Sequence, residues 1–170
     1  IDTVIDHARR LGITSELPPY PSLALGVADI PLQEMVRPFM TFANNGNLRP
    51  IYYLEEIKDR QGNLIFKAQP EIPRQVLPEN EAHLMSNMLS AGQRLRSVYG
   101  LHNEMAGKTG TTQNQVDGWF IGYNPQIVVG IRVGANDVNI HFNTIRLGQG
   151  ANMAMPIFGR FMKDCLESPN

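Results

Sequence analysis

The sequence has a single cysteine, no long hydrophobic run and no excess of charge of either sign. Cys165 has no partner within the chain, which excludes an internal disulfide and a zinc knuckle. No apolar run approaches the ~20 residues that a membrane-spanning helix needs. Lysine and arginine number 15, and aspartate and glutamate number 16, for a net charge of −1. This balance argues against a nucleic-acid partner and against a polybasic membrane surface.

Motifs for metals and cofactors are also missing. HExxH is absent, and none of the four histidines has a second histidine, a cysteine or a carboxylate at metal-ligand spacing. Gly148-Gln149-Gly150 precedes a predicted helix, but neither GxGxxG nor a P-loop lysine accompanies it, so we interpret it as a turn. We therefore expect no metal and no cofactor. The histidines are His7, His83, His102 and His141.

The sequence is 42% hydrophobic, which is enough for one domain with a core. Apolar residues spaced three and four apart predict helices at 1–11, 31–43, 78–91 and 154–167. Stretches rich in β-formers and bounded by turn residues predict strands within 49–67 and at 105–112, 118–123 and 127–134. The last two strands are almost continuously apolar, which indicates cover on both faces. We expect an α+β fold in which an antiparallel sheet carries helices on both faces.

The remaining segments are expected to lack regular structure. We interpret 69–78 as a proline-punctuated linker, 94–104 as a loop and 135–152 as a polar crossover. In the last helix an apolar stripe predicts core side chains, and the methionines of the chain are also expected in the core. Cys165 falls on this stripe, which indicates a buried packing thiol rather than a nucleophile. The stripe consists of Ala154, Phe158, Phe161, Met162, Cys165 and Leu166.

Lys108-Thr109-Gly110 is the segment that points to chemistry. Three such common residues often arise by chance, and an exposed lysine at the entrance of a strand would account for them. The context favours a binding site, because Gly107 and Gly110 leave the backbone bare for a ligand. Short hydroxyls beside an ammonium group suit a carboxylate, and an edge strand can bind a peptide as an extra strand. The pattern predicts an anionic, peptide-like ligand, with hydroxyls from Thr109, Thr111 and Thr112.

These residues resemble KTG, the third signature of the serine penicillin-recognising enzymes, whose first two signatures are SxxK and SxN. Three longer stretches are similar to the bifunctional, class A penicillin-binding proteins. Residues 8–47 resemble the segment after SxN, residues 106–125 resemble the KTG strand and its neighbour, and residues 147–163 resemble the closing helix. On this resemblance, residues 1–170 are expected to be the C-terminal portion of a transpeptidase domain.

The resemblance implies a peptidoglycan D,D-transpeptidase, in which a serine forms an acyl-enzyme with a stem peptide and an amine then captures the acyl group. Penicillin would acylate the same serine. Lys108 would orient the SxN serine and supply positive potential, and Thr109 and Thr111 would bind the substrate carboxylate. The Thr111 N–H would provide half of the oxyanion hole. Gly110 and Thr112 complete the expected substrate-binding strand.

SxxK, however, is absent from the chain. Ser168-Pro169-Asn170 fits SxN but follows KTG instead of preceding it, so we interpret it as chance. The chain also begins with Ile1 rather than methionine and leads directly into a predicted helix. We therefore expect a piece of a longer protein, with the nucleophile, a glycosyltransferase domain and a membrane anchor upstream of Ile1. The chain alone is expected to be inactive.

The resemblance also implies partners and a location. The expected partners are stem peptides ending in D-Ala-D-Ala, β-lactams and the missing N-terminal part of the same domain. The expected location is extracytoplasmic, through the anchor of the parent protein. Two alternatives stay open at this point: a D-Ala-D-Ala carboxypeptidase or β-lactamase, and a penicillin-sensing domain that does not turn over substrate.

Overall fold

The computed structural model is organised around a three-stranded antiparallel sheet formed by residues 106–134. The structure describes residues 1–69, 72–90, 92–102 and 104–167. Strands β5 (Ala106–Thr111), β6 (Asp117–Tyr123) and β7 (Val128–Gly134) lie in the order β5-β6-β7. The three predicted strands are therefore confirmed, and β6 is buried along most of its length, as expected for a strand covered on both faces.

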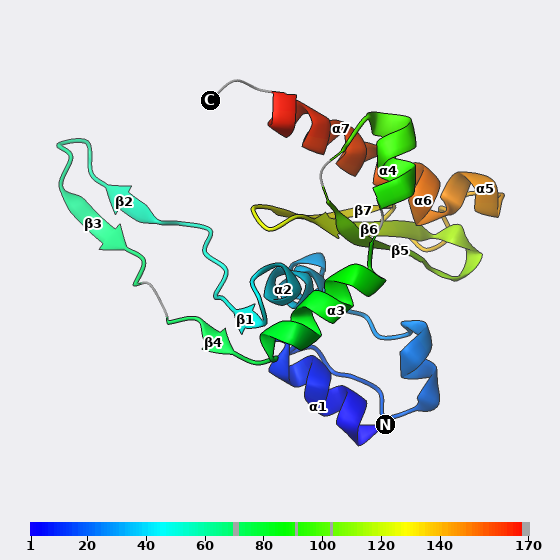
Figure 1. Ribbon diagram of the computed structural model, residues 1–170, viewed down its shortest axis with the longest axis horizontal. Helices are drawn as coiled ribbons and strands as arrows, with labels where there is room; N and C mark the ends of the chain where they lie inside the picture. Colours follow the sequence, from blue (N-terminus) through cyan, green and yellow to red (C-terminus); the bar gives the residue numbers. More distant parts are fainter. Residues whose placement is uncertain (70–71, 91, 103, 168–170) are drawn as a thin grey trace.

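Helices cover both faces of this sheet (Figure 1). One face carries α2 (Leu32–Ala43) and α3 (Glu79–Met88), and the other carries α4 (Gly92–Tyr99), α6 (Gly150–Met153) and α7 (Met155–Glu167). Each layer has its own core. On the α2 side Phe39 and Phe42 pack with Ile121, and on the α7 side Phe120 and Phe158 meet edge to face at 4.9 Å. The predicted α+β arrangement is confirmed.

Glycines in the strands allow these helices to lie close to the sheet. A Cβ atom on Gly122 would lie 2.6 Å from the Phe158 ring, and one on Gly130 would lie 2.5 Å from a Val36 methyl group. Both distances are shorter than a carbon–carbon contact allows, so any larger residue would push α7 or α2 away from the sheet.

The remaining elements surround this three-layer body. Helix α1 (Asp2–Arg10) and the 3-10 helix η1 (Pro21–Leu25) precede α2, and a second 3-10 helix, η2 (Gln113–Gln115), connects β5 to β6. Strand β1 (Asn47–Leu48) pairs with β4 (Arg74–Gln75), which lies in the predicted linker. Strands β2 (Glu56–Lys58) and β3 (Leu64–Lys67) lie within the region 49–67 where strands are predicted. They form a hairpin that projects away from the body, with every strand residue exposed (Figure 1). The short helix α5 (Ile145–Gly148) lies with α6 inside the predicted crossover.

Three predictions about packing are wrong. Segment 94–104 is not wholly a loop, because α4 extends to Tyr99 and buries Leu95 in the α7-side core. Cys165 is exposed rather than buried, and Phe161 on the same predicted stripe is 44% exposed. The methionines are also not uniformly core residues, since Met88 is 74% exposed. Cys165 and Phe161 are predicted to lie in the core but are exposed, because the sheet covers only the side of α7 that carries Phe158 and Met162.

Candidate functional site

Strand β5 carries Lys108-Thr109-Gly110 and forms one edge of the sheet. The beginning of this edge is covered. The N–H of Gly107 donates to the Leu89 carbonyl (2.7 Å), and Ala106 forms an isolated bridge with Ser90. Among the described residues this pairing does not continue to Lys108, so the second half of β5 has an open edge.

The open edge presents backbone donors. Successive residues of an antiparallel strand direct their N–H groups alternately to the two sides. Since the Gly107 N–H points away from β6, the N–H groups of Thr109 and Thr111 face the same outer side. An extended peptide could therefore pair with β5 as an additional strand.

The start of β5 is fixed by the end of α3. The Ser86 hydroxyl lies 3.0 Å from the hydroxyl of Tyr123, which is buried opposite Ala106 in the register. Burial raises the pKa of Tyr123, and the hydrogen bond with Ser86 partly offsets this shift. This contact joins α3 to β6, and α3 ends at Met88, one residue before Leu89, whose carbonyl accepts from the Gly107 N–H.

Lys108 is exposed at the middle of the edge. Its Nζ donates a hydrogen bond to the Thr109 carbonyl at 2.8 Å. No carboxylate within the described ranges lies within 4.0 Å of this ammonium group. The lysine therefore contributes positive charge to the open edge, where an anionic ligand could bind.

Thr111 is held by a residue far along the chain. The Gly150 N–H donates to Thr111 Oγ1 at 3.1 Å. A Cβ atom on Gly150 would lie 2.3 Å from the Trp119 carbonyl oxygen and 2.4 Å from that of Gly110. Only glycine allows this close approach, which places the start of α6 against β5 and β6.

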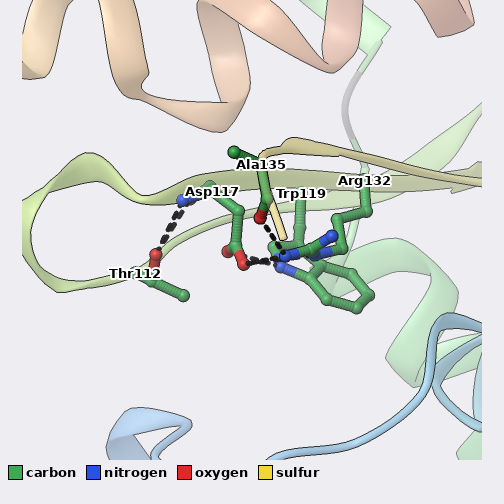
Figure 2. Close-up of polar contacts among 5 residues, drawn as sticks. All are labelled: Thr112, Asp117, Trp119, Arg132 and Ala135. Atoms are coloured by element: carbon green, nitrogen blue, oxygen red, sulfur yellow. Dashed lines mark hydrogen bonds and ion pairs between the residues drawn. The ribbon is translucent and has the colours of Figure 1, made fainter. Parts of the chain in front are cut away.

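Thr112 closes the turn between β5 and β6 (Figure 2). Its hydroxyl accepts from the Asp117 N–H at 3.0 Å and lies 3.2 Å from the Asp117 carbonyl, to which the Thr112 N–H also donates. Asn114 and Gln115 within this turn have φ angles of 56° and 55°, in the left-handed region that non-glycine residues rarely adopt. The hydrogen bonds across the turn help to stabilise this unusual backbone.

A buried carboxylate, that of Asp117, lies beside the same turn (Figure 2). Asp117 Oδ1 accepts from Trp119 Nε1 at 2.8 Å, and Oδ2 accepts from Arg132 Nε at 3.1 Å and from Nη2 at 2.9 Å. Arg132 Nη2 also donates to the Ala135 carbonyl at 3.4 Å. These bonds join β6, β7 and the segment after β7 beside the end of β5.

Asp117, Arg132 and Gly150 are not among the site residues predicted from the sequence. The sequence does contain a signal for Asp117 and Arg132, because each is the one charged residue within a nearly continuous apolar strand. Such a charge is stable in a strand only when a partner lies close by. The sequence around Gly150 indicates only a turn.

The other candidate residues do not join this site. The imidazoles of His7, His83 and His141 hydrogen-bond to Thr3, Asn45 and Phe142 respectively. No group of three His, Cys, Asp or Glu side chains suited to a metal ion occurs within the described ranges. Ser168-Pro169-Asn170 lies outside the described residues.

Comparison with known proteins identifies the protein family to which the chain belongs. Residues 20–163 match the penicillin binding protein transpeptidase domain, and the chain belongs to this family. It is 29% identical over 170 residues to penicillin-binding protein 1A of Neisseria meningitidis, covering 95% of this chain and 21% of that protein. The chain thus spans about a fifth of the length of this curated relative.

Solved structures share the fold. Penicillin-binding protein 1A of Haemophilus influenzae superposes with a TM-score of 0.84 and 23% identity, covering 99% of this chain and 31% of that one. PonA1 of Mycobacterium tuberculosis, solved in complex with penicillin V, superposes with a TM-score of 0.81 and 22% identity, covering 98% of this chain and 50% of that one.

No helix in the described part of the chain is long and apolar enough to cross a membrane.

Proposed function

We propose that residues 1–170 form the C-terminal portion of a peptidoglycan D,D-transpeptidase domain and supply its KTG strand. The observation that carries this proposal is the open edge of β5, where Lys108 and outward N–H groups lie together in a chain of the transpeptidase family. The penicillin V complex of PonA1 supports penicillin as a ligand of the same domain.

The reaction begins at a serine that this chain lacks, since SxxK is absent. The serine oxygen attacks the penultimate D-alanine carbonyl of a stem peptide, and the new ester bond replaces the amide bond to the terminal D-alanine. That D-alanine leaves with a proton on its nitrogen. An amine of a second strand then attacks the ester, an amide bond forms, and the serine oxygen regains a proton. Penicillin acylates the same serine by opening its lactam amide.

Each residue of the strand has a defined role in this proposal. Lys108 orients the SxN serine and attracts the substrate carboxylate, and the hydroxyls of Thr109 and Thr111 donate to that carboxylate. The Thr111 N–H stabilises the oxyanion, for which loss of one donor typically costs ~10²–10³ in rate. Gly110 lets the substrate backbone approach. Thr112, whose hydroxyl is engaged with Asp117, holds the end of the substrate-binding strand.

The partners follow from the same proposal. They are stem peptides ending in D-Ala-D-Ala, β-lactams and the N-terminal part of the same transpeptidase domain, which carries the serine. The substrate is extracytoplasmic, so the domain lies on the outer side of the membrane through an anchor elsewhere in the protein.

Intact-mass spectrometry with a fluorescent penicillin tests the proposal. The complete domain should gain one penicillin, Lys108→Ala should react much more slowly, and the 170-residue chain alone should gain nothing. Lys58→Ala, on the projecting hairpin, is the matched control and should react like wild type. An adduct on the isolated chain would contradict the assignment of the nucleophile to another segment. Failure of the complete domain to react would refute the proposed function.

Product analysis separates the alternatives. A transpeptidase forms a cross-linked product when an acceptor amine is present. A carboxypeptidase releases D-alanine and leaves a shortened peptide, and a β-lactamase releases hydrolysed penicillin. A sensor stays acylated and releases no product.

A further inference from the structure

The Gly148-Gln149-Gly150 segment lies against the proposed substrate-binding strand, although its sequence indicated only a turn. Gly148 packs against the turn between β5 and β6, where its Cβ would lie 2.4 Å from the Cβ of Gln115. Gly150 packs at the end of β5, against the carbonyl oxygens of Gly110 and Trp119. Both glycines of the segment therefore contact the β5–β6 hairpin.

The hydrogen bond from Gly150 determines what the Thr111 hydroxyl can do. A threonine hydroxyl has two acceptor lone pairs and one hydrogen to donate. The Gly150 N–H occupies one lone pair at 3.1 Å. In the part of the chain that the structure describes, no acceptor takes the hydroxyl hydrogen, and the Thr111 side chain is exposed. The hydrogen is therefore free to be donated to a ligand.

A hydroxyl that accepts from one side becomes a better donor on the other, because hydrogen bonds in a chain polarise one another. An ionised carboxylate can only accept hydrogen bonds, whereas a neutral ester is a weaker acceptor and carries no charge. The arrangement at Thr111 thus favours a ligand with an ionised carboxylate at this position.

We propose that Gly150 is a positioning residue, whose N–H fixes the Thr111 hydroxyl as a donor to the substrate carboxylate and so contributes to selection of carboxylate-bearing substrates. This inference rests on the proposed function, because it assumes that a carboxylate binds beside Thr111. It extends that function by giving a role to a segment 39 residues beyond the strand.

Acylation rates of the complete domain test this role, with a penicillin and its methyl ester as the two probes. The measured quantity is the ratio of the second-order rate constants for acid and ester. Thr111→Val keeps the shape but loses the hydroxyl, and this ratio should fall about 10- to 100-fold, as expected for a hydrogen bond to a charged group. Thr111→Ser retains the hydroxyl and should keep most of the ratio. Gly150→Ala, which displaces the N–H, should lower the ratio in the same direction as Thr111→Val.

Gly159→Ala is the matched control, because its Cβ would lie 2.5 Å from the Tyr99 ring of α4, and the three atoms nearest to it all belong to Tyr99 rather than to β5. It should lower the melting temperature while leaving the acid-to-ester ratio within about twofold of wild type. If the acid-to-ester ratio fell as much in Gly159→Ala as in Gly150→Ala, general destabilisation would account for the fall in Gly150→Ala. That result would overturn the proposal.

Hydrogen exchange provides a second measurement that does not require Gly150→Ala to fold. A peptide containing Gly150 should exchange faster in Thr111→Val than in Thr111→Ser, because only serine can accept the Gly150 N–H. Equal exchange in both variants, or an unchanged acid-to-ester ratio in Thr111→Val, would refute the role of this pair. Absence of any acylation in the wild-type domain would instead refute the proposed function itself.

Discussion

Replacement of Asp117 by alanine should destabilise the domain substantially. The change removes the acceptor of the Trp119 Nε1–H and the acceptor of two hydrogen bonds that the Arg132 guanidinium donates, from Nε and Nη2. The Asp117 side chain is 11% exposed and that of Arg132 is 34% exposed, so water can rehydrate the arginine only in part. We expect a loss of about 1 kcal/mol for the indole hydrogen bond and about 1–3 kcal/mol for the partly buried ion pair, or about 2–4 kcal/mol in total.

Urea unfolding of the complete domain measures this loss directly. Asp137→Ala is the matched control, because its carboxylate caps an exposed turn through Asn139, and it should cost less than about 1 kcal/mol. A double-mutant cycle with Arg132→Ala should give a coupling energy of about 1–2 kcal/mol with Asp117→Ala. An Asp117→Ala variant within about 0.5 kcal/mol of wild type would refute the argument that this carboxylate holds the strand ends together.

Two further predictions concern other parts of the fold. Burial opposes ionisation of Glu34, but hydrogen bonds from the Thr14 hydroxyl and the N–H groups of Thr14 and Ser15 outweigh it and lower its pKa to about 2. A lowered pKa stabilises the fold above pH 4.5, so Glu34→Gln should remove about 1–2 kcal/mol at neutral pH, after allowing for solvent screening. In a series of urea titrations, the difference in free energy of unfolding between wild type and variant should shrink as the pH falls from about 4.5 towards 2. A difference that does not change with pH would contradict the lowered pKa of Glu34 as its cause. Gly122→Ala should cost about 1–3 kcal/mol, because its Cβ would lie 2.6 Å from Phe158; an unchanged melting temperature would show that α7 can move away without cost.

The central sheet could be predicted from sequence because its signals are local. The strands at 118–123 and 127–134 are nearly continuous apolar runs, and Asn124 and Pro125 mark the turn between them. Helix α4 could not be predicted in the same way. Its sequence is polar apart from a few residues, and the burial of Leu95 depends on contacts with α7, about 60 residues later in the chain.

In the candidate site, too, the local part could be predicted from sequence and the long-range contacts could not. The motif around Lys108 is contiguous, so a short pattern was sufficient to find it. The contacts that hold the motif come from distant positions, as when Gly150 donates to Thr111 or Asp117 accepts from Arg132. Such contacts depend on strand register and on the path of the crossover after β7, neither of which follows from local propensity.

The partly buried ion pair between Asp117 and Arg132 also specifies the register on which the proposed site depends. In the observed register Arg132 lies opposite Trp119, and Asp117 reaches both side chains on the α2 face of the sheet. A slip of one residue between β6 and β7 would turn Arg132 to the opposite face and leave Asp117 buried without its cation. The burial of β6 alone distinguishes the two registers less strictly, because both of its faces are covered and neither is left to solvent. Asp117, whose carboxylate fixes this register, also donates its backbone N–H to the Thr112 hydroxyl and so closes the turn. Thr112 directly follows Thr111, whose hydroxyl accepts from the Gly150 N–H. Two charges within apolar strands therefore give the end of β5 a defined position, which apolar packing alone would specify less strictly.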